Sequence, residues 1–122
     1  MPYPQFDRHA LHIKPLADRK DKVYIERDHI TPDAEPSPFS EAGQRIIAET
    51  VERIKRAREC GAARMLTFGA HSIKNCLAPV FIKLMEDGWV THPATTGAGI
   101  IHVWKFAFQG HSSEDVRANV DR

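Results

Sequence analysis

The feature that most constrains this chain is an order of elements that occurs twice between residues 62 and 110. A short apolar segment, 63–68, runs into the loop 69–75, and a second segment, 89–96, runs into the loop 95–102. A helical pattern follows each loop. Two strands joined by a helix form a βαβ unit, in which the strands are parallel. We therefore predict an α/β fold with a Rossmann-like parallel sheet and a βαβα core.

Helical periodicity precedes, separates and follows these two strands. Ser40 suits the N-cap of a helix over 40–60, and Gly61 suits its C-terminal end. Between the strands, a helix from about 75 to 87 carries Pro79 near its first turn, where proline is tolerated. We expect the first helix to cover the sheet with a face that consists of Ile46, Ile47, Val51 and Ile54.

The rest of the chain gives weaker patterns. A helix is expected from about 100 to 108, and the run 112–115 is typical of the cap of a last helix that still continues at Arg122. Six of the eight prolines lie in the first 38 residues. Proline lacks an N–H group, so we predict a Pro-rich extended arm over 1–39 with one isolated strand at 23–25.

Residues 40–122 then form a partial Rossmann-like nucleotide-binding domain. Two strands do not make a stable sheet alone, and parallel sheets need both faces covered. We therefore expect an incomplete domain, with further strands from another segment or from a partner chain. The uncovered helix faces also predict a homo-oligomer.

Composition excludes several classes of protein. The 17 Lys and Arg nearly balance the 16 Asp and Glu, and no basic stripe indicates a nucleic-acid partner. No apolar run is long enough to span a membrane, and the N-terminus does not resemble a signal peptide. Cys60 and Cys76 fit no metal or redox spacing, so a reduced, cytoplasmic protein is the simplest interpretation, although a disulfide between them remains an alternative.

The two loops are the candidate binding site. Ligands of parallel α/β sheets bind beyond the carboxyl ends of the strands, and helix N-termini there favour phosphate. Ser72, Thr95 and Thr96 add hydroxyl groups, and glycines allow close approach of the backbone. Any strand-to-helix turn also attracts such residues, so a plain structural turn is the alternative for either loop alone.

The histidines allow a second hypothesis about the same edge. His71 and His102 would converge there, and a zinc site with Cys76 is conceivable, but no pair of residues has metal-ligand spacing. We therefore expect no metal. His9, His12 and His29 are expected on the surface, and Trp89 and Trp104 in the core.

The stretches Leu66–Asn75 (LTFGAHSIKN) and Thr95–His102 (TTGAGIIH) resemble deoxyhypusine synthase, and more closely its bacterial relatives. The resemblance covers about half of the chain. It implies a Rossmann-like, NAD-dependent homotetramer. Such an enzyme oxidises spermidine and passes the aminobutyl group, through an imine on an enzyme lysine, to a lysine of a translation factor.

The resemblance also implies roles for particular residues. The family's acidic polyamine ligands fall on Ile101 and His102, which makes His102 a substrate-binding candidate although neither residue is a carboxylate. The catalytic lysine falls beyond Arg122, so we assign no catalytic residue. The residues implied to contact NAD are Ala70, His71, Ser72, Ile73, Lys74, Thr96, Gly97 and Ala98.

The resulting expectation is the N-terminal part of a deoxyhypusine-synthase-like aminobutyl transferase that binds NAD and a small-molecule substrate, which the resemblance implies is a polyamine. Two alternatives remain open. One is a non-catalytic α/β binding or assembly module, and the other is an unrelated α/β enzyme that acts on a phosphorylated metabolite.

Overall fold

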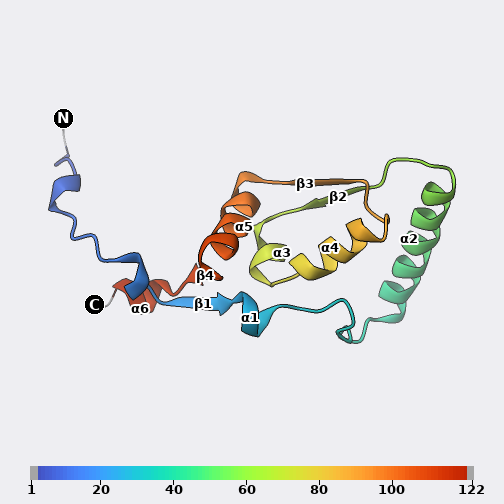
Figure 1. Ribbon diagram of the computed structural model, residues 1–122, viewed down its shortest axis with the longest axis horizontal. Helices are drawn as coiled ribbons and strands as arrows, with labels where there is room; N and C mark the ends of the chain where they lie inside the picture. The colour runs from blue at the N-terminus through green and yellow to red at the C-terminus, as the bar shows by residue number, and fades with distance from the viewer. Residues whose placement is uncertain (1–2, 121–122) are drawn as a thin grey trace.

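The computed structural model describes residues 3–120 and shows a small mixed α/β domain (Figure 1). Two short 3-10 turns, Arg8–Ala10 and Leu16–Asp18, lie in the N-terminal segment. The strands of the described part are β1 (Asp21–Tyr24), β2 (Met65–Phe68), β3 (His92–Thr95) and β4 (His111–Glu114). Its helices are α1 (Ile25–Asp28), α2 (Glu41–Glu59), α3 (Ala70–Lys74), α4 (Ala78–Glu86), α5 (Gly97–Gln109) and α6 (Val116–Val120).

The predicted parallel pair is present. β2 and β3 pair in parallel, with Met65 opposite His92 and Phe68 opposite Thr95, and helices α3 and α4 connect them. The second strand is shorter than the predicted segment and begins only at His92. It includes Pro93, which an edge strand tolerates because the missing N–H need not pair. The βαβ prediction is therefore confirmed for this pair.

The helical segment between β2 and β3 differs in detail from the prediction. The residues predicted as the first loop form a short helix, α3, and the main helix starts at Ala78 instead of Asn75. Between them the chain turns at Cys76, whose φ of 58° lies in the left-handed region. Pro79 does occupy the first turn of α4, because a proline further inside would clash with the preceding turn. Similarly, Gly97 to Gly99, predicted to be a turn, form the first turn of α5.

Helix α2 has the predicted ends but not the predicted packing. The Ser40 hydroxyl accepts a hydrogen bond from the Gly43 N–H at 3.2 Å, and Gly61 adopts a φ of 66° after the last turn. No residue of α2 is buried, however, and its apolar face is exposed. Figure 1 shows α2 standing at one end of the molecule, away from the sheets. The prediction that α2 covers the sheet is wrong for the single chain.

The N-terminal third contributes more structure than expected. The strand predicted to be isolated is β1, which pairs antiparallel with β4 through Asp21–Glu114, Val23–Ser112 and Tyr24–His111. The run 112–115 is therefore largely a strand, and the prediction that all of it caps a helix is wrong. Asp115 alone caps α6, accepting from the Ala118 N–H at 3.1 Å. The predicted continuation of this helix to Arg122 lies outside the described residues.

The core of the described part is small. Ile73, Cys76 and Phe106 are buried, and Val23, Phe68 and Phe81 pack against them. Both cysteines are free, Cys60 on the surface and Cys76 inside. Trp89 is half-buried, but Trp104 is 61% exposed, so its predicted core position is wrong. Within residues 3–120, none of the helices has the length and apolar character needed to cross a bilayer.

Candidate functional site

The two loops predicted to bind a ligand lie side by side. Phe68 and Thr95 end the parallel strands and are register partners, and the Thr95 hydroxyl donates a hydrogen bond to the Phe68 carbonyl at 2.8 Å. The chain enters α3 directly after Phe68 and Gly69, and it enters α5 directly after Thr95 and Thr96. Helices α3 and α5 pack against each other. The carboxyl edge of the sheet therefore carries the first turns of both helices, as the parallel topology requires.

The glycines at the start of α5 have different environments. A Cβ atom added to Gly99 would lie 2.1 Å from Thr95 Oγ1 and 3.3 Å from Thr95 Cβ, so this glycine lets the helix pack closely on the strand. A Cβ atom on Gly97 would meet nothing within 4 Å. The space in front of Gly97 is therefore open. The Thr96 hydroxyl caps the helix by accepting from the Gly99 N–H at 3.3 Å.

The predicted residues of the first loop separate into two groups. The Ile73 side chain is 4% exposed and belongs to the core, so only its backbone can reach a ligand at this edge. His71 is exposed, and Ala70, Ser72 and Lys74 are half-buried. Lys74 makes no ion pair or side-chain hydrogen bond within the described residues. Lys74 is the last residue of α3, and its charge acts on His102 of α5. An unpaired ammonium group is suited to an anion.

His102 lies on α5 near the same residues. Its Nδ1 is 2.7 Å from the hydroxyl oxygen of the fully buried Ser112. Burial lowers the pKa of His102, and the positive charges of Lys105, Lys74 and His71 lower it further, against the opposing effect of Glu114. The charges of His71 and Lys74 on α3 thus act on His102 of α5. Because Lys105 is paired with Glu114, the unpaired charge here is the Lys74 ammonium group, which favours an anionic ligand over a cationic polyamine.

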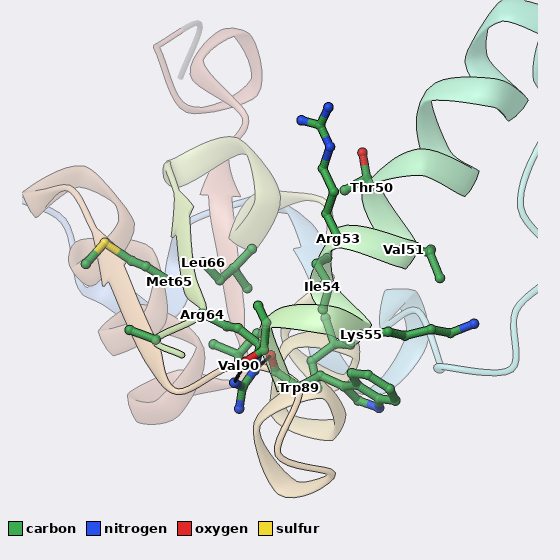
Figure 2. Close-up of a pocket in the computed structure, with 13 residues that line it drawn as sticks. Thr50, Val51, Arg53, Ile54, Lys55, Arg64, Met65, Leu66, Trp89 and Val90 are labelled. Atoms are coloured by element: carbon green, nitrogen blue, oxygen red, sulfur yellow. Dashed lines mark hydrogen bonds between the residues drawn. The ribbon is translucent and has the colours of Figure 1, made fainter. Parts of the chain in front are cut away.

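An apolar groove of about 550 Å³ lies elsewhere, between α2 and the amino end of β2 (Figure 2). Because it adjoins Ala63–Leu66 at the start of the strand, it is separate from the ligand edge at the strand's carboxyl end. Its apolar lining residues are Val51, Ile54, Ala57, Ala63, Met65, Leu66, Leu84, Trp89 and Val90.

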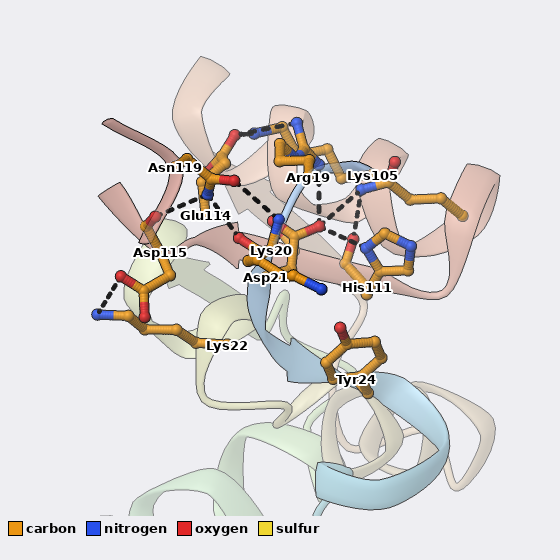
Figure 3. A network of polar contacts seen from close by, with 12 residues as sticks. Arg19, Lys20, Asp21, Lys22, Tyr24, Lys105, His111, Glu114, Asp115 and Asn119 are labelled. Atoms are coloured by element: carbon orange, nitrogen blue, oxygen red, sulfur yellow. Dashed lines mark hydrogen bonds and ion pairs between the residues drawn. The ribbon is translucent and has the colours of Figure 1, made fainter. Parts of the chain in front are cut away.

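A polar network that the sequence did not predict joins β1, α5 and β4 (Figure 3). The Asp21 side chain is fully buried and accepts hydrogen bonds from Arg19 at 3.1 Å and from the His111 ring. Glu114 accepts from Arg19 at 3.4 Å and from Lys105, whose hydrogen bond lowers the pKa of Glu114. Arg19 and Glu114 are 95 residues apart in the chain. No local pattern could have revealed the Arg19–Glu114 and Asp21–His111 pairs, which hold the N-terminal strand onto the body.

The described residues do not form a metal site of the kind considered above. Within 3–120, no three His, Cys, Asp or Glu side chains gather in an arrangement that could hold a metal ion. Cys76 is buried, and burial raises the pKa of its thiol, so it remains protonated. This thiol is therefore a packing group in the core.

Comparison of the chain with protein families, with curated proteins and with solved structures found no match.

Proposed function

We propose that the edge formed by Ala70–Lys74 and Thr96–Ala98 binds the pyrophosphate of a dinucleotide, NAD. The observation that carries this proposal is the adjacency of Phe68 and Thr95, which brings the starts of α3 and α5 to one edge. The unpaired Lys74, at the end of α3, adds a cation whose charge acts on His102 of α5. Free N–H groups at the 13-residue helix α5, open space at Gly97 and a positive neighbourhood are the properties that a pyrophosphate requires.

The identity that this site supports best is the nucleotide-binding portion of a Rossmann-like, deoxyhypusine-synthase-like transferase. The support is the order of the elements, β2–α3–α4–β3–α5, together with the resemblance at both loops. His102 is a weak candidate for holding a polyamine, because its neighbours Lys74 and Lys105 are cations. In this proposal the chain supplies the nucleotide-binding edge.

An NMR titration of the folded chain with NAD tests the proposal. Amide shifts are expected at 70–74 and 96–99, and Lys74→Gln and Gly97→Val should each weaken them, the first by removing charge and the second by filling the open space. Lys55→Gln on α2 is the matched control and should change nothing. Absence of shifts at these loops, in a sample whose circular dichroism shows a folded chain, would contradict the proposal.

Separate titrations with AMP and with pyrophosphate distinguish the related alternative. Shifts with pyrophosphate and none that depend on adenosine would favour an enzyme that acts on a phosphorylated metabolite. Shifts that need the whole dinucleotide would support NAD.

A non-catalytic assembly module is the second candidate, and a different observation favours it. Large apolar side chains are exposed on α2, on β2 and on one face of α5, for example Ile46, Met65 and Trp104. Such surfaces are typical of protein interfaces. A chain that self-associates and gives no loop shifts with any nucleotide would identify this function.

A further inference from the structure

Helix α2 is attached to the rest of the chain at its C-terminal end. The Arg58 guanidinium lies 4.1 Å from the centre of the Trp89 ring. Arg64, just after the helix, donates to the carbonyl oxygens of Ala57, Gly88 and Trp89 at 3.1–3.3 Å. The preceding turns of α2 run along one end of the molecule, where Val51 and Ile54 line the apolar groove and no residue of the helix is buried (Figure 1). The helix is therefore held in a fixed direction while most of its length remains uncovered.

The uncovered face of α2 is an apolar stripe. Ile46, Ile47, Val51 and Ile54 recur at helical spacing and are 38–64% exposed. The small residues Gly43, Thr50 and Ala57 fall on the same face at seven-residue intervals. Small residues on an apolar face permit two helices to approach closely.

The chain exposes more surface than a compact monomer of its mass. Its exposed area is 9901 Å², whereas a compact monomer of 13.8 kDa exposes about 6,600 Å². The extended N-terminal segment, where Tyr3 and Ile13 are 80% and 91% exposed, contributes to this excess, and the uncovered face of α2 contributes as well (Figure 1). The excess of about 3,300 Å² leaves room for the roughly 1,000–2,500 Å² that each partner contributes to an obligate interface.

The charges of α2 indicate which partner fits. Residues 41–52 carry three Glu and one Arg, and residues 53–59 carry three Arg, one Lys and one Glu. Two copies of this helix laid antiparallel would place the acidic half of each against the basic half of the other. A parallel pair would oppose like charges. The same asymmetry suits the dipole of a single helix, so the pairing needs a direct test.

We propose that α2 is a homodimer interface, in which the apolar stripe of one copy packs antiparallel against the same stripe of a second copy. The contact is isologous, with the two-fold axis close to Val51. Glu49 and Arg53 lie equally far from Val51, so Glu49 of each helix faces Arg53 of the other. This proposal does not depend on nucleotide binding.

Sedimentation equilibrium of the full chain tests the interface. We expect twice the 13.8 kDa mass of the monomer. Ile47→Glu places a charge in the stripe and should weaken association by about 100-fold. Ile100→Glu on α5, where the side chain is comparably exposed, is the matched control and should leave the dimer intact. A monomer at all concentrations, or a dimer that Ile100→Glu dissociates and Ile47→Glu does not, would overturn the proposal.

A charge exchange tests the antiparallel register. Each single variant, Glu49→Arg or Arg53→Glu, places like charges opposite one another in its homodimer. The homodimer of each variant should therefore dissociate more readily than that of the parent chain. Mixed together, the two variants form two Arg–Glu pairs across the axis and should recover a heterodimer. The ion pair between Glu49 and Arg53 within one helix is broken in each variant and stays broken after mixing. Recovery of dimer formation on mixing therefore reports contacts between the two chains. Failure of the mixture to associate better than either variant would overturn the antiparallel arrangement.

Discussion

Helix α2 is highly charged with one apolar stripe, helix α5 is predominantly apolar, and the two helices have very different surroundings. Helix α5 packs against α3 and β4, buries Phe106 and Gly99, and is tied to β4 through His102 and Lys105. Helix α2 buries no residue and depends on contacts at its C-terminal end. The difference shows that an apolar stripe on a helix predicts a packing surface. It does not predict whether the partner belongs to the same chain or to another one.

Helix α5 repeats this contrast on its own two sides. Phe106 is 8% exposed, whereas Phe108 is 65% exposed and stacks on Trp104 with ring centres 5.0 Å apart. The side toward α3 behaves as a core, and the opposite side behaves as a surface. Two side chains of one type, two residues apart, therefore provide a matched comparison.

The largest expected effect comes from Phe106→Ala. Truncating a buried phenylalanine in a core of three buried apolar residues should reduce the free energy of unfolding by about 3–5 kcal/mol. Phe108→Ala, on the exposed side, should reduce it by less than about 1 kcal/mol. Urea unfolding followed by circular dichroism measures both. Equal losses for the two variants would show that α5 has no distinct core side.

Gly99→Ala should have the next largest effect. The added methyl group would displace the Thr95 side chain and break its hydrogen bond to the Phe68 carbonyl, at a cost of about 1–3 kcal/mol. Gly97→Ala, with open space around it, is the control and should be neutral or slightly stabilising. If thermal unfolding shows no difference between these variants, the close contact of α5 with β3 is not as described.

Arg64→Met should weaken the attachment of α2 without unfolding the body. The variant loses four hydrogen bonds to carbonyl groups, one of them to Ala62, but keeps an apolar stem, so we expect a loss of about 1–2 kcal/mol. Amide exchange in the last turn of α2 should accelerate, and exchange in α5 should not. Acceleration in both helices would mean that α2 and the body unfold together.

The smallest expected effect is a pH dependence at His102. Its folded-state pKa is lowered below the ordinary 6.5, so the unfolded chain binds more protons in this range. The contribution of neutral His102 to the free energy of unfolding is therefore fully present above about pH 6.5 and is lost as the pH falls through the folded-state pKa. Lys74→Gln should raise this pKa toward its ordinary value, and Lys55→Gln should not. Histidine NMR titration measures the pKa of His102 in both variants. Identical titrations of the parent chain and Lys74→Gln would contradict an effect of the Lys74 charge on His102.

The sequence predicted those features that local physics determines. Ser40 and Gly61 bound α2 because cap and left-handed positions depend on adjacent residues. The parallel pairing of β2 and β3 followed from the helix between them. The same two loops, identified by their glycines and hydroxyl groups, lie together at the strand ends.

Long-range contacts account for the features that the sequence did not predict. Pairing with β1 makes the run 111–114 a strand although its serines favour a helix cap, because the Asp21 network and the buried Ser112 stabilise the strand. Trp104 lies in an apolar run, which predicts a core position, yet its helix turns that side outward. The Ile73 side chain packs into the core, so a contact of Ile73 with a ligand would involve its backbone.

Hydrogen exchange measured at two protein concentrations tests the contrast between α2 and α5 most directly. We expect α5 and β4 to be protected equally at both concentrations, because contacts within one chain cover them. Residues 41–54 of α2 should exchange rapidly in dilute solution and become protected at high concentration, when a second copy covers the stripe. Protection of α2 that is already complete in dilute solution would show that its own chain covers it, and would contradict this account.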